Sequence, residues 1–95
     1  MVVGTLKITL LVHDNRSLKG KRKVVKSIVD RIKHRFNVGV AEVGSNDLWQ
    51  RIELGVCTVG NDRRHVDASL TKVLSFTDSL HLAELVDSHM EILNV

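Results

Sequence analysis

Residues 17–36 combine the apolar pattern of an α-helix with a high concentration of positive charge. Apolar residues recur there at three- and four-residue steps, which predicts an amphipathic helix with one buried face. These residues are Leu18, Val25, Ile28, Val29, Ile32 and Phe36. From Arg16 to Arg35 there are nine Lys or Arg residues and one acid, Asp30. The rest of the chain has five basic and ten acidic side chains, so the net charge of +3 conceals a basic helix on an acidic body.

The start of this predicted helix is electrostatically unfavourable. Ser17 is a suitable N-cap, because its hydroxyl can accept a hydrogen bond from a free amide of the first turn. The next turns hold Lys19, Lys21, Arg22 and Lys23, although the positive end of the helix dipole favours acids. Two interpretations stay open at this point. The cations form an anion-binding surface together with the free amides, or they form a solvated face whose aliphatic stems cover apolar neighbours.

The length and composition of the chain indicate one globular domain, residues 1–95. Cys57 is the only cysteine, which excludes an internal disulfide and a multi-cysteine zinc site and fits a reducing, cytoplasmic compartment. The apolar opening lacks the basic start of a signal peptide and is interrupted by Thr5, Lys7 and Thr9. No run of residues approaches the length of a membrane span, so we expect no membrane association.

The order of predicted elements indicates an α+β fold. Alternating or β-rich apolar runs predict four strands, at residues 2–12, 38–43, 49–59 and 83–95. Helical periodicity predicts two helices, at residues 17–36 and from Asn61 or Asp62 to about Leu80. The order β-α-β-β-α-β is that of a ferredoxin-like sandwich. We therefore expect a four-stranded antiparallel sheet with both helices on one face.

Four sequence motifs resemble the YlxP-like proteins, small bacterial proteins of unassigned function. They are Ser-Leu-Lys-Gly-Lys-Arg-Lys at 17–23, Asn-Val-Gly-Val-Ala-Glu-Val-Gly at 37–44, Asp-Leu-Trp-Gln-Arg at 47–51 and Val-Gly-Asn-Asp at 59–62. The resemblance covers nearly the whole chain and implies a ferredoxin-like fold. It also implies a gene neighbourhood shared with translation and ribosome-assembly factors, ribosome-binding factor A among them. Gly20 departs from the family pattern, in which we expect an acid, so the resemblance implies a helix start prone to fraying.

No constellation of residues indicates catalysis, a metal or a cofactor. Gly20-Lys21 lacks the upstream glycine and the Ser/Thr of a phosphate-binding loop. Cys57 has no histidine at a telling offset, so we interpret it as an ordinary half-buried cysteine. The histidines have no metal-ligand spacing and are expected at the surface; those considered are His13, His81 and His89. We therefore expect a protein that is not an enzyme.

Trp49, the only tryptophan, is an interface candidate together with Arg51, two residues further along. It could stack on a base or anchor a protein interface. The alternative is a hydrophobic plug at one end of the sheet, which the usual burial of tryptophan favours. RNA-recognition motifs stack bases on aromatic residues of the two central strands, and here the residues expected to face outward on those strands include no aromatic.

The sequence leads to two function hypotheses. In the first, the chain binds structured RNA, which we expect to be ribosomal, through contacts with phosphates that depend little on base sequence. The predicted contact residues are Arg16, Lys19, Lys21, Arg22, Lys23, Lys26 and Lys33. In the second, the chain is a protein-interaction module, including a homodimer, that uses an edge strand at 38–43 or an apolar patch of Leu11, Cys57 and Val59. Should the basic side chains instead pair with the chain's own acids, the candidate partners are Glu42, Asp47 and Glu53.

Overall fold

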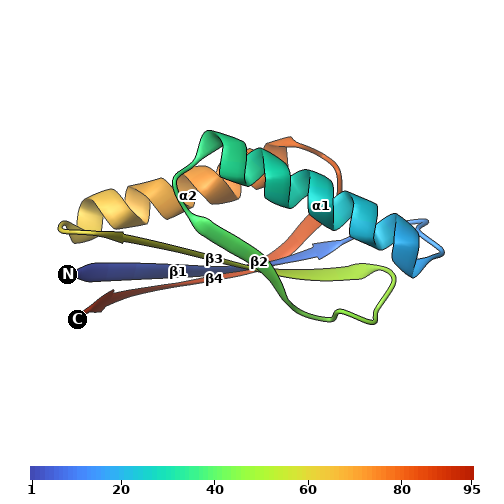
Figure 1. Ribbon diagram of the computed structural model, residues 1–95, viewed down its shortest axis with the longest axis horizontal. Helices are drawn as coiled ribbons and strands as arrows, with labels where there is room; N and C mark the ends of the chain where they lie inside the picture. Colours follow the sequence, from blue (N-terminus) through green and yellow to red (C-terminus); the bar gives the residue numbers. More distant parts are fainter.

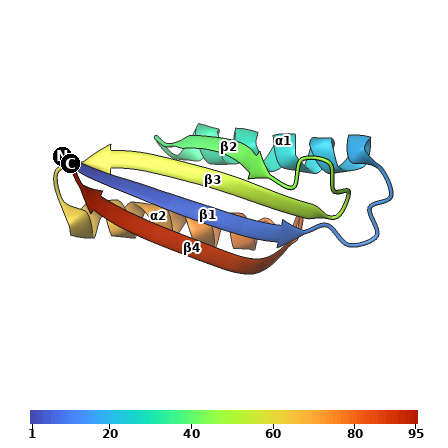
Figure 2. The same cartoon turned by 90° about the horizontal axis from the view of Figure 1, so that it is seen from below.

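Two helices lie on one face of a four-stranded sheet, and the other face of the sheet is open (Figures 1 and 2). The computed structural model describes all residues, 1–95. Its elements are β1 (Val2–Leu11), α1 (Leu18–Arg35), β2 (Gly39–Gly44), β3 (Arg51–Gly60), α2 (Arg63–Ser79) and β4 (Glu84–Asn94). The strand order is β2-β3-β1-β4, and all neighbouring strands are antiparallel. The ferredoxin-like α+β arrangement expected from the element order is therefore confirmed.

The core lies between the sheet and the two helices. Alternate residues of the central strands point into it, and Ile8, Leu10 and Leu54 have no exposed surface. A side chain at Gly4 would overlap Val66 of α2, so the glycine allows this helix to approach β1 closely. The helices divide the sheet between them: α2 packs over β1, β3 and β4, whereas α1 packs over β2.

Both helices begin at side-chain caps. Ser17 Oγ accepts a hydrogen bond from the Gly20 amide at 3.0 Å, which confirms the predicted cap of α1. Of the two candidates for the second cap, the structure uses Asp62, which accepts from the Arg64 amide at 3.0 Å. α1 is continuous through Gly20, and the expected fraying of its start stays a prediction. Neither helix combines the length and the apolar composition needed to cross a bilayer.

Each edge of the sheet carries an irregularity. β2 is the short edge strand, as expected, and its pairing with β3 shifts between Glu42 and Gly44, which leaves Val43 as the extra residue of a bulge. Val43 folds over Gly55, where a side chain would meet it at 2.7 Å. β4 is the opposite edge and carries three exposed acids, which are Glu84, Asp87 and Glu91.

The third strand begins at Arg51 rather than at Trp49, because residues 45–50 form a loop.

Candidate functional site

Five cations of α1 form one stripe on the side of the helix that faces away from the sheet. They recur at three-, four- and seven-residue steps, so at 3.6 residues per turn they occupy about a third of the helix circumference. These residues, which we call the basic stripe, are Lys19, Arg22, Lys23, Lys26 and Lys33. All five are exposed, as the sequence predicts. The stripe is about 21 Å long, since a helix rises 1.5 Å per residue.

Most of the stripe is electrostatically unpaired. Lys26 forms an ion pair with Asp30 at 2.8 Å, and this hydrogen bond raises the pKa of the Lys26 ammonium. No other cation of the basic stripe has a carboxylate within 4.0 Å. Arg16, which precedes the helix cap, is also exposed and unpaired. The charge of this face is therefore available to an anionic partner.

Lys21 does not belong to this surface, and the expectation that it is an exposed cation is wrong. Its side chain is 0% exposed. The ammonium lies under the loop between β2 and β3, where it donates to the carbonyl oxygens of Ser45 at 2.6 Å, Arg51 at 3.2 Å and Asn46 at 3.4 Å. Those three bonds use the three protons of the ammonium group. Lys21 therefore fastens the β2–β3 loop to the first turns of α1.

The charge of Lys21 is balanced by Glu42 of β2. Lys21 Nζ lies 3.0 Å from Glu42 Oε2, yet this carboxylate oxygen is buried and accepts no hydrogen bond of acceptable geometry. The interaction is thus mainly Coulombic, because the protons of the ammonium point to the carbonyl groups. Of the acids considered as internal partners for the basic side chains, Glu42 is the one that Lys21 uses.

The β2–β3 loop presents two large apolar side chains to solvent. Trp49 is 54% exposed and Leu48 is 52% exposed, so the interpretation of Trp49 as a buried plug is wrong. The side-chain amide of Asn15 donates to Trp49 O at 2.5 Å and to Ser17 O at 2.8 Å. It thereby ties the loop to the residue that caps α1. The burial of Trp49 could not be predicted from the sequence, because it depends on where Asn15 holds the loop.

Charged groups near the middle of the open sheet face neutralise one another. Glu53 pairs with Lys7 at 3.0 Å and lies 3.8 Å from Arg51, the second interface candidate, whose side chain is exposed on this face. Ser45 Oγ donates to Glu53 Oε2 at 2.5 Å. The Ser45 hydroxyl, followed by Lys7 and then Arg51, holds the pKa of the Glu53 carboxyl below its usual range.

The same face carries exposed apolar side chains on both sides of these charges. Val59 is 65% exposed, and Val43 and Leu93 are also exposed. Cys57 is exposed rather than half-buried as expected, whereas Leu11 is partly buried. A shallow groove crosses Gly55, with Val43 and Cys57 among its lining residues. Of the predicted patch, only Cys57 and Val59 lie close together, because Leu11 pairs with Arg51 at the other end of β1.

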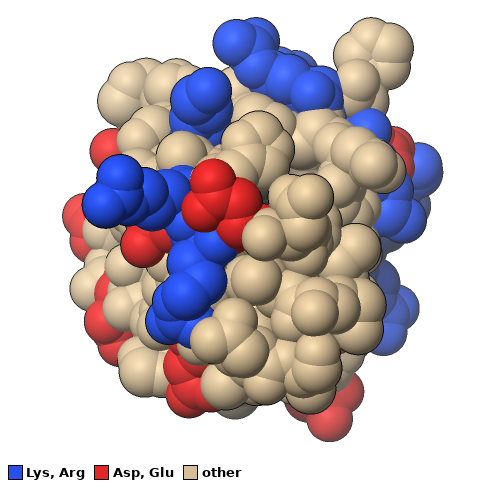
Figure 3. Space-filling view, turned by 90° about the vertical axis from the view of Figure 1, so that its left-hand side faces the viewer, with Lys and Arg blue, Asp and Glu red and all other residues tan.

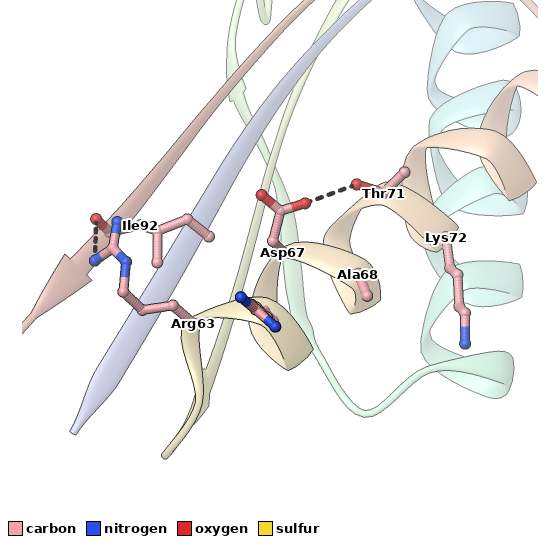
Figure 4. A pocket seen from close by; sticks show the side chains of 7 residues that line it. Arg63, Asp67, Ala68, Thr71, Lys72 and Ile92 are labelled. Carbon is pink, nitrogen blue, oxygen red and sulfur yellow. Dashed lines mark hydrogen bonds between the residues drawn. The ribbon is translucent and has the colours of Figure 1, made fainter.

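A second group of cations lies on α2, where Arg63 and Arg64 are adjacent in the first turn. A shallow pocket between α2 and β4 is lined by Arg63, Asp67 and Lys72 among others (Figure 4). Arg63 donates to Ile92 O at 3.2 Å, whereas Lys72 forms no ion pair. Figure 3 views the end of the molecule at which α2 begins, and there basic and acidic side chains alternate. This group lacks the continuous single sign of the basic stripe.

The histidines lie at the surface, as expected. His89 Nε2 is 3.0 Å from Glu91 Oε1, and His13 Nε2 is 3.5 Å from Glu84 Oε2. Neither pair is joined by a third such residue, and the structure contains no group of three or more His, Cys, Asp or Glu side chains arranged to hold a metal ion.

Two solved structures show the same fold at low sequence identity. SnoaB, a cofactor-independent oxygenase from Streptomyces nogalater, matches with a TM-score of 0.52 and 11% identity over 98% of this chain and 92% of its own. LarC2, the C-terminal domain of a cyclometallase involved in synthesis of the NPN cofactor of lactate racemase, matches with a TM-score of 0.50 and 13% identity over 98% of this chain and 55% of its own.

The sequence relatives are more informative about the family than about its activity. The uncharacterized protein YlxP of Bacillus subtilis (strain 168) is 37% identical over 78 residues, which are 82% of this chain and 85% of the relative. The family model described as "Protein of unknown function (DUF503)" matches residues 3–90. The resemblance inferred from the four sequence motifs is thereby confirmed, and the chain belongs to the DUF503 family of YlxP-like proteins.

Proposed function

We propose that this chain is a non-enzymatic RNA-binding protein that contacts phosphates through the basic stripe of α1 and acts in the cytoplasm on the ribosome or its assembly. The observation that carries the proposal is the separation of the stripe from the acids of the chain. Lys19, Arg22, Lys23 and Lys33 share one exposed helix face, and none has a carboxylate within 4.0 Å. The family's expected neighbourhood of translation genes supports a ribosomal RNA as the partner.

The chemistry of the stripe favours binding by charge with little reading of sequence. Four of its five members are lysines, which act as point charges towards phosphate rather than as bidentate readers of bases. Each neutralised phosphate releases condensed counterions, so the affinity falls steeply as salt rises. The open sheet face has acids beside its cations and no exposed aromatic ring, and it is therefore a poorer RNA surface than α1.

The test compares two double charge reversals that change the net charge equally. The first is Lys19→Glu with Lys23→Glu in the basic stripe. The matched control is Arg64→Glu with Lys72→Glu on α2, since both residues are exposed and unpaired as well. Affinity for ribosomal RNA fragments is measured by electrophoretic shift over a series of salt concentrations.

The two variants are expected to differ in both affinity and salt dependence. Loss of two phosphate contacts makes the slope of log K against log salt shallower by about 2 units in the stripe variant. The α2 variant retains the wild-type slope. Equal weakening by both variants would show that only net charge matters, and absence of binding by the wild type at low salt would refute the proposal.

The open sheet face supports a second candidate function, association with another copy of the chain. Val59 is 65% exposed there beside the exposed Cys57, and Cys57 and Val43 line one shallow groove on the same face. Exposed apolar side chains that group in this way are typical of protein interfaces. Sedimentation at micromolar concentration tests this candidate. A dimer that Val59→Lys dissociates supports it, and a monomeric wild type excludes it.

A further inference from the structure

The loop between β2 and β3 holds an exposed aromatic ring on an immobilised backbone. Leu48 N donates to Ser45 O at 3.0 Å within the loop, and Val12 N donates to Gln50 O at 2.8 Å at its end. Asn15 fastens the Trp49 carbonyl, and Lys21 fastens the start of the loop from below. The exposure of Trp49 is therefore a property of a fixed conformation. A half-exposed tryptophan on a fixed backbone is the kind of residue that anchors a partner.

The ring stands at the end of the molecule where the basic stripe begins. Figure 1 shows the β2–β3 loop and the first turn of α1 at the same end. The amide of Asn15 bonds both Trp49 O and Ser17 O, so the loop and the cap of α1 share one side chain. Arg16 lies between Asn15 and Ser17 in the chain, and Lys19 follows in the first turn. A polyanion that follows the stripe and continues past the first turn of α1 would therefore reach the end of the molecule that carries Trp49.

The loops at this end differ from the stripe in what they can bind. They carry two exposed acids, Asp14 and Asp47, which make the loops themselves a poor phosphate site. Their distinctive contribution is the apolar ring of Trp49. Aromatic rings stack on bases of any sequence, but inside an A-form duplex the bases are already stacked and paired. A ring of this kind thus fits a base that is unpaired.

Building on the proposed RNA-binding function, we infer that Trp49 stacks on an unpaired base next to the RNA segment whose phosphates lie along the basic stripe. The preferred ligand is thus a stem with an adjoining loop or bulge rather than a continuous duplex. Stacking on one base contributes about 1–3 kcal/mol, which corresponds to about 5- to 150-fold in affinity.

The experiment uses the full chain and two RNA probes, a hairpin with an unpaired adenine-containing loop and a long, fully paired duplex with few ends. Trp49→Ala is compared with Trp49→Phe, which keeps an aromatic ring, and with Leu48→Ala, which removes a neighbouring side chain of similar exposure. Because the chain has a single tryptophan, quenching of its fluorescence reports stacking directly.

We expect Trp49→Ala to weaken hairpin binding about 5- to 150-fold at every salt concentration, with an unchanged salt slope, because stacking releases no counterions. Trp49→Phe and Leu48→Ala should bind nearly as the wild type does, and duplex binding should be insensitive to all three. The inference is overturned if Trp49→Ala leaves salt-sensitive binding of the hairpin unchanged and the hairpin does not quench the fluorescence of the wild type. The proposed function would still stand in that case. Equal losses on hairpin and duplex also overturn it, and the absence of any RNA binding overturns both.

Discussion

The two helices occupy equivalent places in the two halves of the fold, yet they contact the sheet by different means. α2 covers three strands and its buried residues are Val66, Leu70, Val73 and Thr77. α1 lies mainly over β2 and also bonds the start of β3 through Lys21, and its buried residues are Ile28, Ile32 and the charged Lys21. Both first turns lack acids, but only α1 adds a continuous row of cations. The difference indicates that α2 mainly stabilises the fold, whereas α1 combines a smaller set of fully buried apolar residues with an exposed basic surface.

The largest expected effect tests the structural role of α2. Leu70 has no exposed surface and lies beside Gly4, where α2 closely approaches β1. Leu70→Ala should lower the free energy of unfolding by about 2–5 kcal/mol, because it removes buried methyl groups and leaves a cavity. Urea denaturation measures the loss. RNA affinity measured where the variant is still folded should not change; a strong loss of affinity would contradict the division of roles.

Lys21→Met tests the charged contact of α1. The change leaves Glu42 without its counter-ion and three carbonyl groups without a donor, and so should destabilise the fold by about 2–4 kcal/mol. This lies slightly below the usual cost of breaking a buried pair, because Glu42 is only partly buried. Lys19→Met is the matched control, and a change at this exposed site should stay within about 0.5 kcal/mol. If urea denaturation shows equal effects of the two substitutions, the buried contacts of Lys21 do not stabilise the fold.

Adding Glu42→Gln to Lys21→Met sharpens the interpretation of that result. The second change removes the orphaned carboxylate charge, so the double variant should recover part of the stability lost in Lys21→Met. A double variant less stable than Lys21→Met would mean that Glu42 supports the loop independently of Lys21.

Acidification probes the loop that α1 holds. The folded-state pKa of Glu53 is depressed first by the Ser45 hydroxyl and then by Lys7, so its contribution to stability is present at neutral pH. This contribution is lost as the pH falls below the usual range of a glutamate and through the folded pKa. In Ser45→Ala the depression is smaller, so the stability difference from the wild type should narrow on acidification. Thermal unfolding of both proteins at several pH values measures this stability difference. A difference that does not change with pH would contradict the role of Ser45 in lowering the pKa of Glu53.

The smallest expected effect on stability belongs to the basic stripe. Lys19→Glu places an acid in the first turn of α1, where it contributes about 0.3–1 kcal/mol at an exposed site, and Lys23→Glu adds an acid just beyond that turn, where the dipole contributes less. The melting temperature should therefore hold or rise slightly while RNA affinity falls. A lower melting temperature would show that the stripe stabilises the fold. A lower melting temperature together with unchanged RNA affinity would argue against the proposed function.

The sequence contained the fold and part of the site. Alternation in β1, the helical steps of α1 and the caps Ser17 and Asp62 are local patterns, so they predict local structure well. The burial of Lys21 was also readable, since it shares the three- and four-residue spacing of Leu18 and Val25. Its charge concealed that spacing, because a lysine is rarely enclosed without a partner from elsewhere in the chain.

Other features depended on distant contacts that no local pattern contains. The position of the Trp49 backbone depends on a hydrogen bond with Asn15, which is 34 residues earlier in the chain. The absence of a side chain at Gly20 has a similar cause, because a Cβ there would collide with Asn15 and lie 3.1 Å from Ser17 Oγ. The departure of Gly20 from the family pattern thus fits the packing of Asn15 rather than a weakness of the helix.

The acids on β4 and the basic stripe lie at opposite edges of the sheet, since α1 covers β2 (Figure 2). This separation gives the molecule an electric dipole across its width. A polyanion would turn the protein before contact so that α1 leads and β4 trails. The effect raises the association rate at low ionic strength and weakens as the Debye length shrinks to about 8 Å at physiological salt. The order of the strands would therefore determine how the protein is oriented when it approaches a polyanion.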